Sequence, residues 1–577
     1  MMDMNTNDMS IAELRKTDWQ FAARRIVRAL RDTAIEPGES ITEIVVKITA
    51  LAYYMWSWNP RGWRCRTPEE DQDDIIKLQH LVAEARLEEA VKKDLIECVR
   101  IYWRQIWLCA HSYPIHTNKA VALCFVHARD VHSVTPMPIV TLAEQVLDIQ
   151  AGDSVADLGA GYGTFLCDAS QYGVSFAEGY DINPSAYRIS KIRNWLLQGK
   201  IYFTFENAFT ERALGYKVDK VFSHMPAMVR DSMVPCAPVL QPYVKDVPSL
   251  TRMTWASILA AVEKMKQTGK AVVIVPTNVL AKTGKGEQRI RERLLQKGLV
   301  ETVISLPTGI GIPARPALSM VVLSYGNRAV RMVNATRLRP NDIDTVAALT
   351  KNDGTYSQVI TLEQMGAQEW VWIPERYIIL PEDMVQNGKS IGELQVSIKR
   401  GRTLLAADLA DLISAEKTAY GYLMLNDLAD GQITKMTYLK EWKPMYERYA
   451  VQEGDLLLSR SMPFKMAVVP DLGKLVVMAS GNMYAIRFKK GLMHPVYAML
   501  YIMSAQGTRQ LQRLSQGDTL QSISLGELQS FQIPMIPFAE QERIAEAYMK
   551  LQAKLNELKE AEEAVRDQIQ KLLTDKA

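Results

Sequence analysis

The sequence predicts an α/β protein in which a helical N-terminal domain, a doubly wound α/β domain and a mixed α+β domain follow one another, with a long helix at the end. Three observations predict this order. Apolar residues recur at three- and four-residue spacing up to about residue 130, short β-branched runs then alternate with helical segments, and a heptad pattern closes the chain. A length of 577 residues fits about three or four domains of usual size.

Residues 1–130 are expected to form the helical domain, because segments such as "DWQFAARRIVRAL" and "DLIECVRIYWRQIWL" place apolar residues on one helical face. The apolar stretch "ITEIVVKITALAYYMWSW" is interrupted by Glu43 and Lys47, so we expect neither a signal peptide nor a membrane span. Six scattered cysteines without a Cys-x-x-Cys pair favour a reduced, cytoplasmic protein, and we expect no metal site.

Residues 131–345 are predicted to form the doubly wound domain. Its β-branched runs are "SVADLGAG", "SFAEGYDIN", "KVDKVFSH", "KAVVIVPT", "VETVISLP" and "SMVVLSY", and the helical segments between them are typical of crossovers in a parallel sheet. A connecting segment is expected at 346–375. Short strands and turns such as "GDLLLSRS" and "ASGNMYAIRF" predict the mixed domain at 376–540.

The last segment, 541–577, carries apolar residues in alternating steps of four and three. They are Ile544, Tyr548, Leu551, Leu555, Leu558, Val565, Ile569 and Leu572, with Glu562 in the one missing register. This heptad predicts a coiled-coil seam and a homodimer. The alternative is an amphipathic helix that packs on its own domain.

A pocket for a nucleoside cofactor is predicted at "VADLGAGYGTF". Gly159, Gly161 and Gly163 make a tight turn between a strand and a helix, where backbone amides can approach a ligand. About 20 residues on, the strand "FAEGYDIN" ends in Asp181, at the place where an acidic side chain binds ribose hydroxyls. Asp157 just before the glycines suits a cofactor with a positively charged amino-acid end, so S-adenosylmethionine fits better than NAD. A glycine-rich turn without a ligand is the alternative.

From about residue 130 to 330 the chain resembles the modification subunit of type I restriction-modification systems, the γ-class DNA adenine N6-methyltransferases. The stretches "SVTPMPIVTLAEQVL", the glycine loop, "GYDINPSAYRISKIRNWLLQG" and "AVVIVPTNVLAKTGKGEQRIRERLLQKGLVETVISLPTGI" follow the order of the family motifs. The resemblance implies a Rossmann-like, S-adenosylmethionine-dependent methyltransferase domain. It also implies that Thr135 and Pro136 line the methionine end of the cofactor, and that Asn207 in "FENAF" replaces an Asp that accepts the amino group of the cofactor's adenine.

The second half resembles one target-recognition domain and one helix of a type I specificity subunit, in "EGDLLLSRS", "ASGNMYAIRF", "QGDTLQSISLGELQSFQIPMIPFAEQERI" and the terminal helix. Such a subunit normally carries two of each, so the resemblance implies a homodimer that reads a bipartite, palindromic site in double-stranded DNA. Candidate phosphate contacts are the "KRGRT" run at 399–403, Arg460 and Lys465, with ordinary surface charge as the alternative. The net charge of +3 does not decide between them.

The heptapeptide "FSHMPAM" stands where the family carries Asn-Pro-Pro-Phe. Aligned from Asp219, His224 takes the Asn position, Met225 and Pro226 take those of the two prolines, and Ala227 that of the aromatic residue. The family accepts the amino hydrogens of a flipped-out adenine on the Asn side chain and a Pro carbonyl, and stacks the aromatic ring on the base. Losing one preorganised polar partner costs about 3 kcal/mol, and losing the stacking ring a further ~1–3 kcal/mol. These positions predict a slow or inactive enzyme.

Two hypotheses follow from these residues. The first is an active, site-specific adenine-N6 methyltransferase of a restriction-modification or phage-defence system. The second is a pseudoenzyme, a sequence-specific DNA-binding protein that keeps the cofactor pocket and the dimer seam. The degenerate "HMPA" motif favours the second. No phosphate loop of an ATPase and no nuclease cluster stands out, so a restriction, helicase or intact methyltransferase subunit would be a separate partner.

Overall fold

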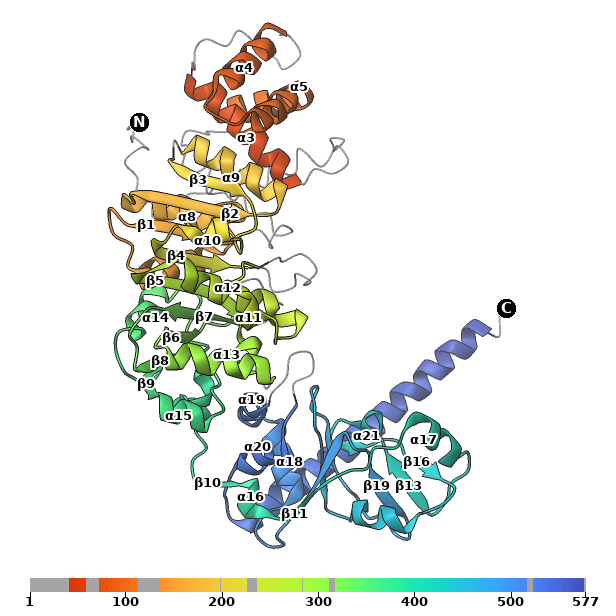
Figure 1. Ribbon diagram of the computed structural model, residues 1–577. Coiled ribbons are helices and arrows are strands. Elements are labelled where there is room, and N and C mark those ends of the chain that lie inside the picture. The colour runs from red at the N-terminus through yellow and green to blue at the C-terminus, as the bar shows by residue number, and fades with distance from the viewer. Residues whose placement is uncertain are drawn as a thin grey trace. The chain divides into compact units, whose positions relative to one another are not determined.

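The computed structural model describes residues 41–58, 72–112, 134–197, 199–225, 236–282, 284–310, 317–515 and 522–574 (Figure 1). The chain divides into two compact units, one that ends at Ile378 and one that begins at Ile379. Within the described ranges, every helix is too short or too polar to cross a membrane. The predicted fold class is confirmed: helices come first, an α/β unit follows, and a mixed α+β unit ends in a long helix.

The N-terminal helices that the structure describes pack on the α/β unit and share a core with it. Their apolar faces share one hydrophobic cluster with helix α9, to which α9 contributes Ile189 and Ile192. The helices are α3 (Ile41–Trp58), α4 (Gln72–Glu84), α5 (Glu89–Ser112) and α9 (Pro184–Leu196).

The two charged residues that interrupt the apolar stretch of α3 are buried and paired. Lys47 Nζ lies 3.3 Å from Glu43 and 2.8 Å from Asp94 of α5. Glu43 also accepts a hydrogen bond from Nε of Arg188 on α9 at 2.7 Å. A buried charge persists only where it is paired. These ion pairs therefore orient α3 against both α5 and α9.

One nine-stranded sheet organises the first unit, in the order β3-β2-β1-β4-β5-β7-β6-β8-β9. Strands β3, β2, β1, β4 and β5 are parallel, as predicted, but "SMVVLSY" forms β7, which is antiparallel to both β5 and β6. Antiparallel neighbours need only a short connection. The strands are β1 (Ser154–Asp157), β2 (Phe176–Asp181), β3 (Ile201–Phe205), β4 (Val218–His224), β5 (Met265–Pro276), β6 (Val300–Ser305), β7 (Leu318–Leu323), β8 (Ala329–Asn334) and β9 (Ser357–Thr361).

The segment expected to connect the two units, 346–375, contributes to the first unit instead. β9 pairs antiparallel with β8 at the edge of the sheet, and its Ile360 is 3% exposed. Thr361 then caps α15 (Leu362–Ala367) through a capping box with Gln364. A short, largely polar strand such as β9 gives little periodic signal, which explains why the sequence did not show it.

The strand order predicts a ligand site at the carboxyl ends of the strands around β1. β1 lies between β2 and β4, so the chain turns in opposite directions on the two sides of β1. Ligands of doubly wound folds bind outside the carboxyl ends of the strands at such a switch point. Helices α11 (Gln241–Val244), α12 (Ser249–Lys264) and α13 (Lys285–Gln296) lie on one face of the sheet (Figure 1).

The second unit has two four-stranded sheets, β11-β20-β17-β18 and β12-β16-β13-β19. Helices α18 (Pro495–Met503), α19 (Ala505–Leu514) and α20 (Leu525–Ser530) pack on the first sheet around a separate hydrophobic core. The strands are β11 (Gln395–Arg400), β12 (Ile413–Ser414), β13 (Tyr420–Leu423), β16 (Thr437–Leu439), β17 (Leu456–Ser459), β18 (Met466–Val468), β19 (Val476–Ala479) and β20 (Met483–Phe488).

The terminal helix α21 (Phe538–Thr574) has two parts (Figure 1). Its beginning belongs to the core of the second unit, where Ala545 is buried and Ile544 and Tyr548 pack beside it. Beyond this point the seam residues are 43% to 69% exposed; they are Leu551, Leu555, Leu558, Val565 and Ile569. The side chain of Leu572 lies outside the described part. The beginning of the helix therefore packs on its own domain, as the alternative expected, and the coiled-coil seam stays a prediction for the exposed stretch.

Candidate cofactor site and DNA interface

The glycine loop joins the carboxyl ends of three neighbouring strands. The loop follows β1, and its backbone amides donate to both flanking strands: Leu158 N to the carbonyl of Phe222 at 3.0 Å, and Ala160 N to that of Tyr180 at 2.9 Å. Gly163 has a φ of 72°, a left-handed conformation that favours glycine, and α8 (Thr164–Ala169) begins directly after it. These contacts fix the loop at the carboxyl ends of β1, β2 and β4.

Asp157, at the end of β1, is a buried carboxylate in the centre of this site. It is 2% exposed and its Oδ1 accepts a hydrogen bond from Gly159 N at 3.1 Å. Burial, aided by the nearby Asp181 carboxylate, raises the pKa of Asp157 to about 7 against the opposing effect of that hydrogen bond. Within the described ranges it has no ion pair with a Lys or Arg. Such a carboxylate favours a cationic ligand.

Asp181 ties the end of β2 to the loop. Its Oδ2 accepts from Gly161 N at 2.8 Å and its Oδ1 from Asn183 N at 2.7 Å. Burial raises the pKa of Asp181, although these backbone hydrogen bonds oppose the rise. Each carboxylate oxygen keeps a second lone pair for a hydroxyl. Asn207 follows β3, and its Oδ1 accepts from Phe209 N at 2.9 Å, so the side chain shapes the turn that begins there.

The degenerate motif lies in direct contact with the predicted cofactor residues. His224 is the last residue of β4, and its Nδ1 is 3.0 Å from Oγ1 of Thr135, just before α7 (Met137–Leu147), whose N-cap is Pro136. A Cβ atom on Gly159 would lie 2.8 Å from Sδ of Met225, so the Met225 thioether packs on the first glycine of the loop. Pro226 and Ala227 lie outside the described residues.

These two contacts were missed by sequence reasoning. Thr135 and His224 are 89 positions apart, and Gly159 and Met225 are 66 apart, so no local pattern links them. A strand-end rule can place Asp157, Asp181 and His224 at one edge of the sheet, but it carries no information on side-chain contacts.

The candidate phosphate contacts of the second unit converge at one end of its first sheet. Arg400, the last residue of β11, pairs with Tyr484 of β20, and the Arg460 guanidinium lies 5.6 Å from the centre of the Tyr484 ring. Lys465, just before β18, donates from its backbone N to Ser459 Oγ at 2.8 Å and from Nζ to the Leu425 carbonyl at 3.2 Å. None of the three basic residues has an ion pair within the described ranges, which leaves their positive charges uncompensated.

The remaining arginine of "KRGRT" is held differently. The Arg402 guanidinium lies 5.2 Å from the ring centre of Tyr446 and 5.6 Å from that of Tyr449. Stacking between rings gives Arg402 a structural role in its domain. Groups of three or more His, Cys, Asp or Glu placed to bind a metal are absent from the part of the chain that the structure describes.

Comparison with known families identifies the class of protein. Residues 131–381 match the N-6 DNA methylase family, so this part of the chain is an N-6 DNA methylase domain. Residues 389–565 match the type I restriction modification DNA specificity domain. The chain therefore carries an N-6 DNA methylase domain joined, in one polypeptide, to a type I specificity domain. No curated protein matches it by sequence.

Solved structures resemble the chain at low sequence identity. The type IIG restriction endonuclease BpuSI is 12% identical, with a TM-score of 0.51 over 92% of this chain and 74% of that one. The methyltransferase subunit of a type I restriction-modification system from Streptococcus thermophilus is 14% identical, with a TM-score of 0.48 over 63% of this chain and 99% of that one. The likeness to BpuSI supports the fold.

S-adenosylmethionine is the cofactor of this methylase class. The residues of the site fit it. Asp157 offers a buried anionic partner for the positively charged amino-acid end, and Asp181 offers acceptors for ribose hydroxyls. Bound there, the cofactor would supply an activated methyl group. The Met225 thioether must leave Gly159 for a ligand to lie against that glycine, and three rotatable bonds allow the movement.

We expect cofactor affinity to depend on pH through Asp157. A carboxyl group with a pKa of about 7 is mostly protonated below that pH, and only its ionised form attracts a cation. Affinity should therefore be full above pH 7 and fall by up to about tenfold per unit below it. Titration calorimetry with S-adenosylmethionine from pH 5.5 to 8.5 measures this. The Asp157→Asn variant should bind more weakly at pH 8, with little pH dependence; an unchanged slope in this variant would assign the titration to another group.

Proposed function

We propose that this chain is a sequence-specific DNA-binding protein that binds S-adenosylmethionine but has impaired or lost adenine-N6 methylation. The observation that supports the proposal is the contact between His224 and Thr135 at the carboxyl end of β4. An Asn side chain at this place would offer a carbonyl oxygen to the amino group of adenine. The imidazole places Nδ1 beside the Thr135 hydroxyl instead; when that hydroxyl donates to Nδ1, Nε2 carries the ring hydrogen and the neutral ring has no acceptor left for the base. Removing one such polar partner costs about 3 kcal/mol, or a hundred- to thousandfold in rate.

Met225 supports the same proposal. Its thioether lies against Gly159, between the motif and the glycine loop. A proline at this position would be rigid and compact, whereas the methionine side chain takes up space beside the loop. The chain must therefore reorganise before a cofactor and a flipped base can both occupy the site, and this cost adds to that of the missing acceptor.

The alternative function is an active, site-specific adenine-N6 methyltransferase. The cofactor side of the site supports it, because Asp157 and Asp181 both accept hydrogen bonds from amides of the intact glycine loop. Long-read sequencing of a methylation-free bacterial host that expresses the chain separates the two. A modified bipartite palindrome would establish the enzyme and reveal its target. An unmodified genome, with soluble protein that binds cofactor and DNA, supports the loss of catalysis.

The proposed DNA interface is the basic end of the first sheet in the second unit. Arg400, Arg460 and Lys465 come from separate segments of the chain, and none is neutralised by an acidic partner within the described ranges. Phosphate contacts of this kind position a protein on a duplex and make its affinity depend on salt.

We expect the Arg400→Ala/Lys465→Ala variant to bind DNA more weakly on all sequences. If each residue contacts one phosphate, the slope of log affinity against log salt should fall by about 2 in magnitude. Fluorescence anisotropy with a labelled duplex at several salt concentrations measures this slope. Lys490→Ala is the matched control, because this exposed lysine follows β20 at the opposite end of the same sheet. A loss in the control equal to that in the variant would argue against a localised interface.

A homodimer through the exposed part of α21 completes the proposed DNA reader. Each chain carries one specificity domain, so two chains related by a two-fold axis would read two half-sites. A cleavage function would come from a restriction or helicase subunit, and methylation from an intact methyltransferase subunit. The match of residues 389–565 to the type I restriction modification DNA specificity domain supports such an assembly. A protein that binds bacterial DNA as part of such a system would be located in the cytoplasm.

A further inference from the structure

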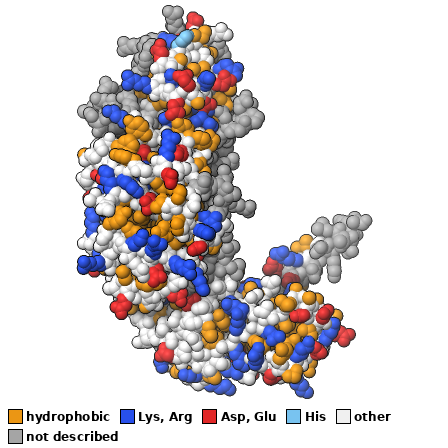
Figure 2. Space-filling view, viewed as in Figure 1, with side chains coloured by type: hydrophobic (Ala, Val, Ile, Leu, Met, Phe, Trp, Pro, Cys, Tyr) orange, Lys and Arg blue, Asp and Glu red, His pale blue; other side chains and the backbone are white. Residues whose placement is uncertain are grey.

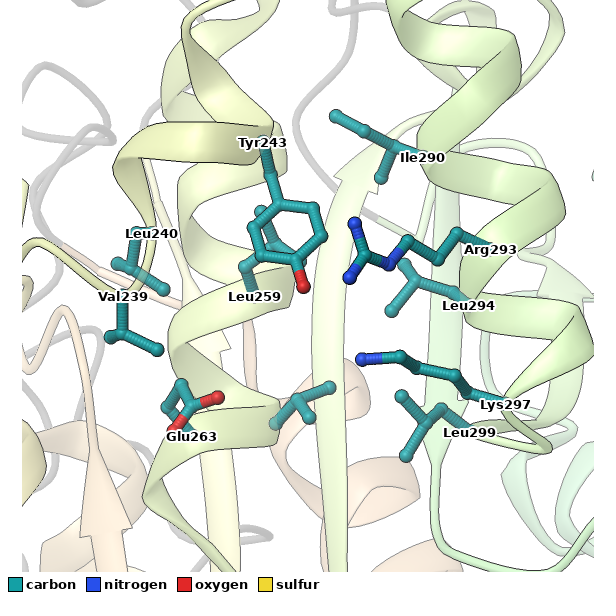
Figure 3. Close-up of a pocket in the computed structure, with 11 residues that line it drawn as sticks. Val239, Leu240, Tyr243, Leu259, Glu263, Ile290, Arg293, Leu294, Lys297 and Leu299 are labelled. Atoms are coloured by element: carbon teal, nitrogen blue, oxygen red, sulfur yellow. The ribbon is translucent and has the colours of Figure 1, made fainter.

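A groove on the outer face of the methylase domain lies between helices α11, α12 and α13 (Figure 3). Its apolar lining is largely buried; the residues are Leu240, Leu259, Val262, Ile290, Leu294 and Leu299. Val239 stands at the rim and is 45% exposed. The cavity holds about 40 Å³, enough for the end of one apolar side chain but far below the size of small-molecule sites, which is ~300–1,000 Å³. A nucleoside or cofactor is therefore excluded.

Positive charge borders the groove on the α13 side. Figure 3 shows Arg293 and Lys297 reaching from α13 toward Tyr243 and the α12 side, with the Arg293 guanidinium 4.6 Å from the centre of the Tyr243 ring. Glu263, on the opposite side, is paired with Lys217 at 3.4 Å. In Figure 2, hydrophobic and basic side chains mingle on the face of the first unit that carries α12 and α13.

The two cations of the groove continue a longer basic ridge along α13. Lys285, Arg289, Arg293 and Lys297 recur every four residues, so they lie on one side of the helix. None of the four has an ion pair within the described ranges. The acidic residues of α13 do not neutralise the ridge, because Glu287 is buried and accepts from Thr251 at 3.2 Å, and Glu292 accepts from Gln296.

Helix stability does not explain this ridge. Like charges four residues apart destabilise a helix by about 0.2–0.5 kcal/mol per pair. The helix dipole stabilises Arg293 and Lys297 at the carboxyl end, but Lys285 stands in the first turn, where a positive charge is unfavourable. A ridge that weakens its own helix points to an anionic partner.

From these observations we propose that the groove of α11, α12 and α13 docks an acidic, amphipathic helix of a partner protein. The partner inserts an apolar side chain between Val239 and Leu294 and places carboxylates against Arg293 and Lys297. The apolar floor of the groove favours a protein partner over nucleic acid. A phosphate backbone could pair with the basic ridge, but it has no apolar group to insert into the groove. Helix-in-groove recognition through anchors spaced three and four residues apart is a recurring mode of protein association. The inference does not depend on whether the methylase is active.

The test uses the full chain and a fluorescent helical peptide of about 20 residues, with leucines on one face and glutamates beside them. We expect the Arg293→Glu/Lys297→Glu variant to bind this peptide roughly tenfold or more weakly than the wild type. A second peptide, with each Glu replaced by Gln, should bind the wild-type chain about as weakly as the acidic peptide binds the Arg293→Glu/Lys297→Glu variant. The matched control is Lys351→Glu, an exposed lysine outside the groove, which should not change binding.

A second variant, Val239→Glu, places a negative charge at the exposed rim without touching the core, and it should also weaken binding of the acidic peptide. Circular dichroism and S-adenosylmethionine binding verify that each variant is folded. Equal peptide affinity in the wild type and both variants would overturn the proposal. So would intact peptide binding in the Arg293→Glu/Lys297→Glu variant with selective loss of affinity for a non-specific DNA duplex, since the ridge would then serve nucleic acid.

Discussion

The variant His224→Asn/Met225→Pro/Ala227→Phe should methylate adenine roughly a hundred- to thousandfold faster than the wild-type chain. It restores the amide acceptor at the carboxyl end of β4, removes the thioether from Gly159 and returns a ring for stacking on the flipped base. Transfer of a radiolabelled methyl group from S-adenosylmethionine to genomic DNA of a methylation-free host measures the rate.

Two controls make this experiment specific. His224→Ala with the same changes at 225 and 227 removes the ring contact with Thr135 but supplies no acceptor, so it should remain slow. Adding Thr135→Val to the restored variant tests whether the hydroxyl captures the new Asn side chain, in which case the rate should rise further. No gain in either restored variant, with cofactor and DNA binding intact, would mean that these three positions alone do not block the reaction.

The Leu555→Glu/Leu558→Glu variant should convert a dimer into a monomer. Both leucines are exposed within the chain, and full burial of such a side chain is worth about 1.5–3 kcal/mol, so two buried charges in their place should raise the dimer dissociation constant by several orders of magnitude. Sedimentation equilibrium over a range of concentrations measures this. Met549→Glu is the matched control: Met549 is 50% exposed and lies off the heptad seam.

A truncation provides an independent test, and the structure decides where it must end. A chain that ends just before Ile544 would lack Ala545, which is buried in the core of the second unit. A chain that ends at Lys550 keeps Ala545 and Tyr548 in this core, and it loses the exposed seam together with the contacts of Asn556 with Gln432 and of Lys559 with Asp430. It should be monomeric, and its affinity for a duplex with a single half-site should equal its affinity for a duplex with the full bipartite site, counted per half-site. A dimer that persists in both the truncated and the substituted chain would contradict the proposed seam.

Much of the fold was predictable because hydrophobic periodicity reports which face of an element is buried. The parallel strands around β1 appear as β-branched runs, and the glycine loop with Asp157 and Asp181 is legible because strand ends in such a sheet meet at one edge. The direction of β7 and the edge strand β9 were not legible, since periodicity does not encode pairing partners. Glu43 and Lys47 interrupt an apolar helix in the sequence, yet their mutual pairing makes them part of its buried face.

The candidate site shows the same division. Residue types and spacing indicated which side chains belong to the site, but the contacts of His224 with Thr135 and of Met225 with Gly159 arise only in the folded chain. The seam of α21 was recognised as a repeat, but the point where the helix leaves its own domain depends on tertiary packing. Ala545 and Tyr548 pack in the core of the second unit, and Asn556 and Lys559 still contact Gln432 and Asp430. A periodic pattern shows that one face of a helix is apolar. It does not show whether that face packs on the same chain or on a partner.

Because α21 is anchored to its own domain, the length of its exposed part would set the distance between the two domains of a dimer. Tyr548 donates to the Asp430 carbonyl at 3.3 Å, Asn556 donates to Gln432 at 3.2 Å, and Lys559 pairs with Asp430 at 2.6 Å, so one turn of the domain grips the helix at three points. From 551 to 574 the helix spans roughly 36 Å, close to one turn of B-DNA. In a dimer joined along this stretch, the gap between half-sites would be counted in residues, and inserting one heptad would lengthen the arm by about 10 Å, or some three base pairs.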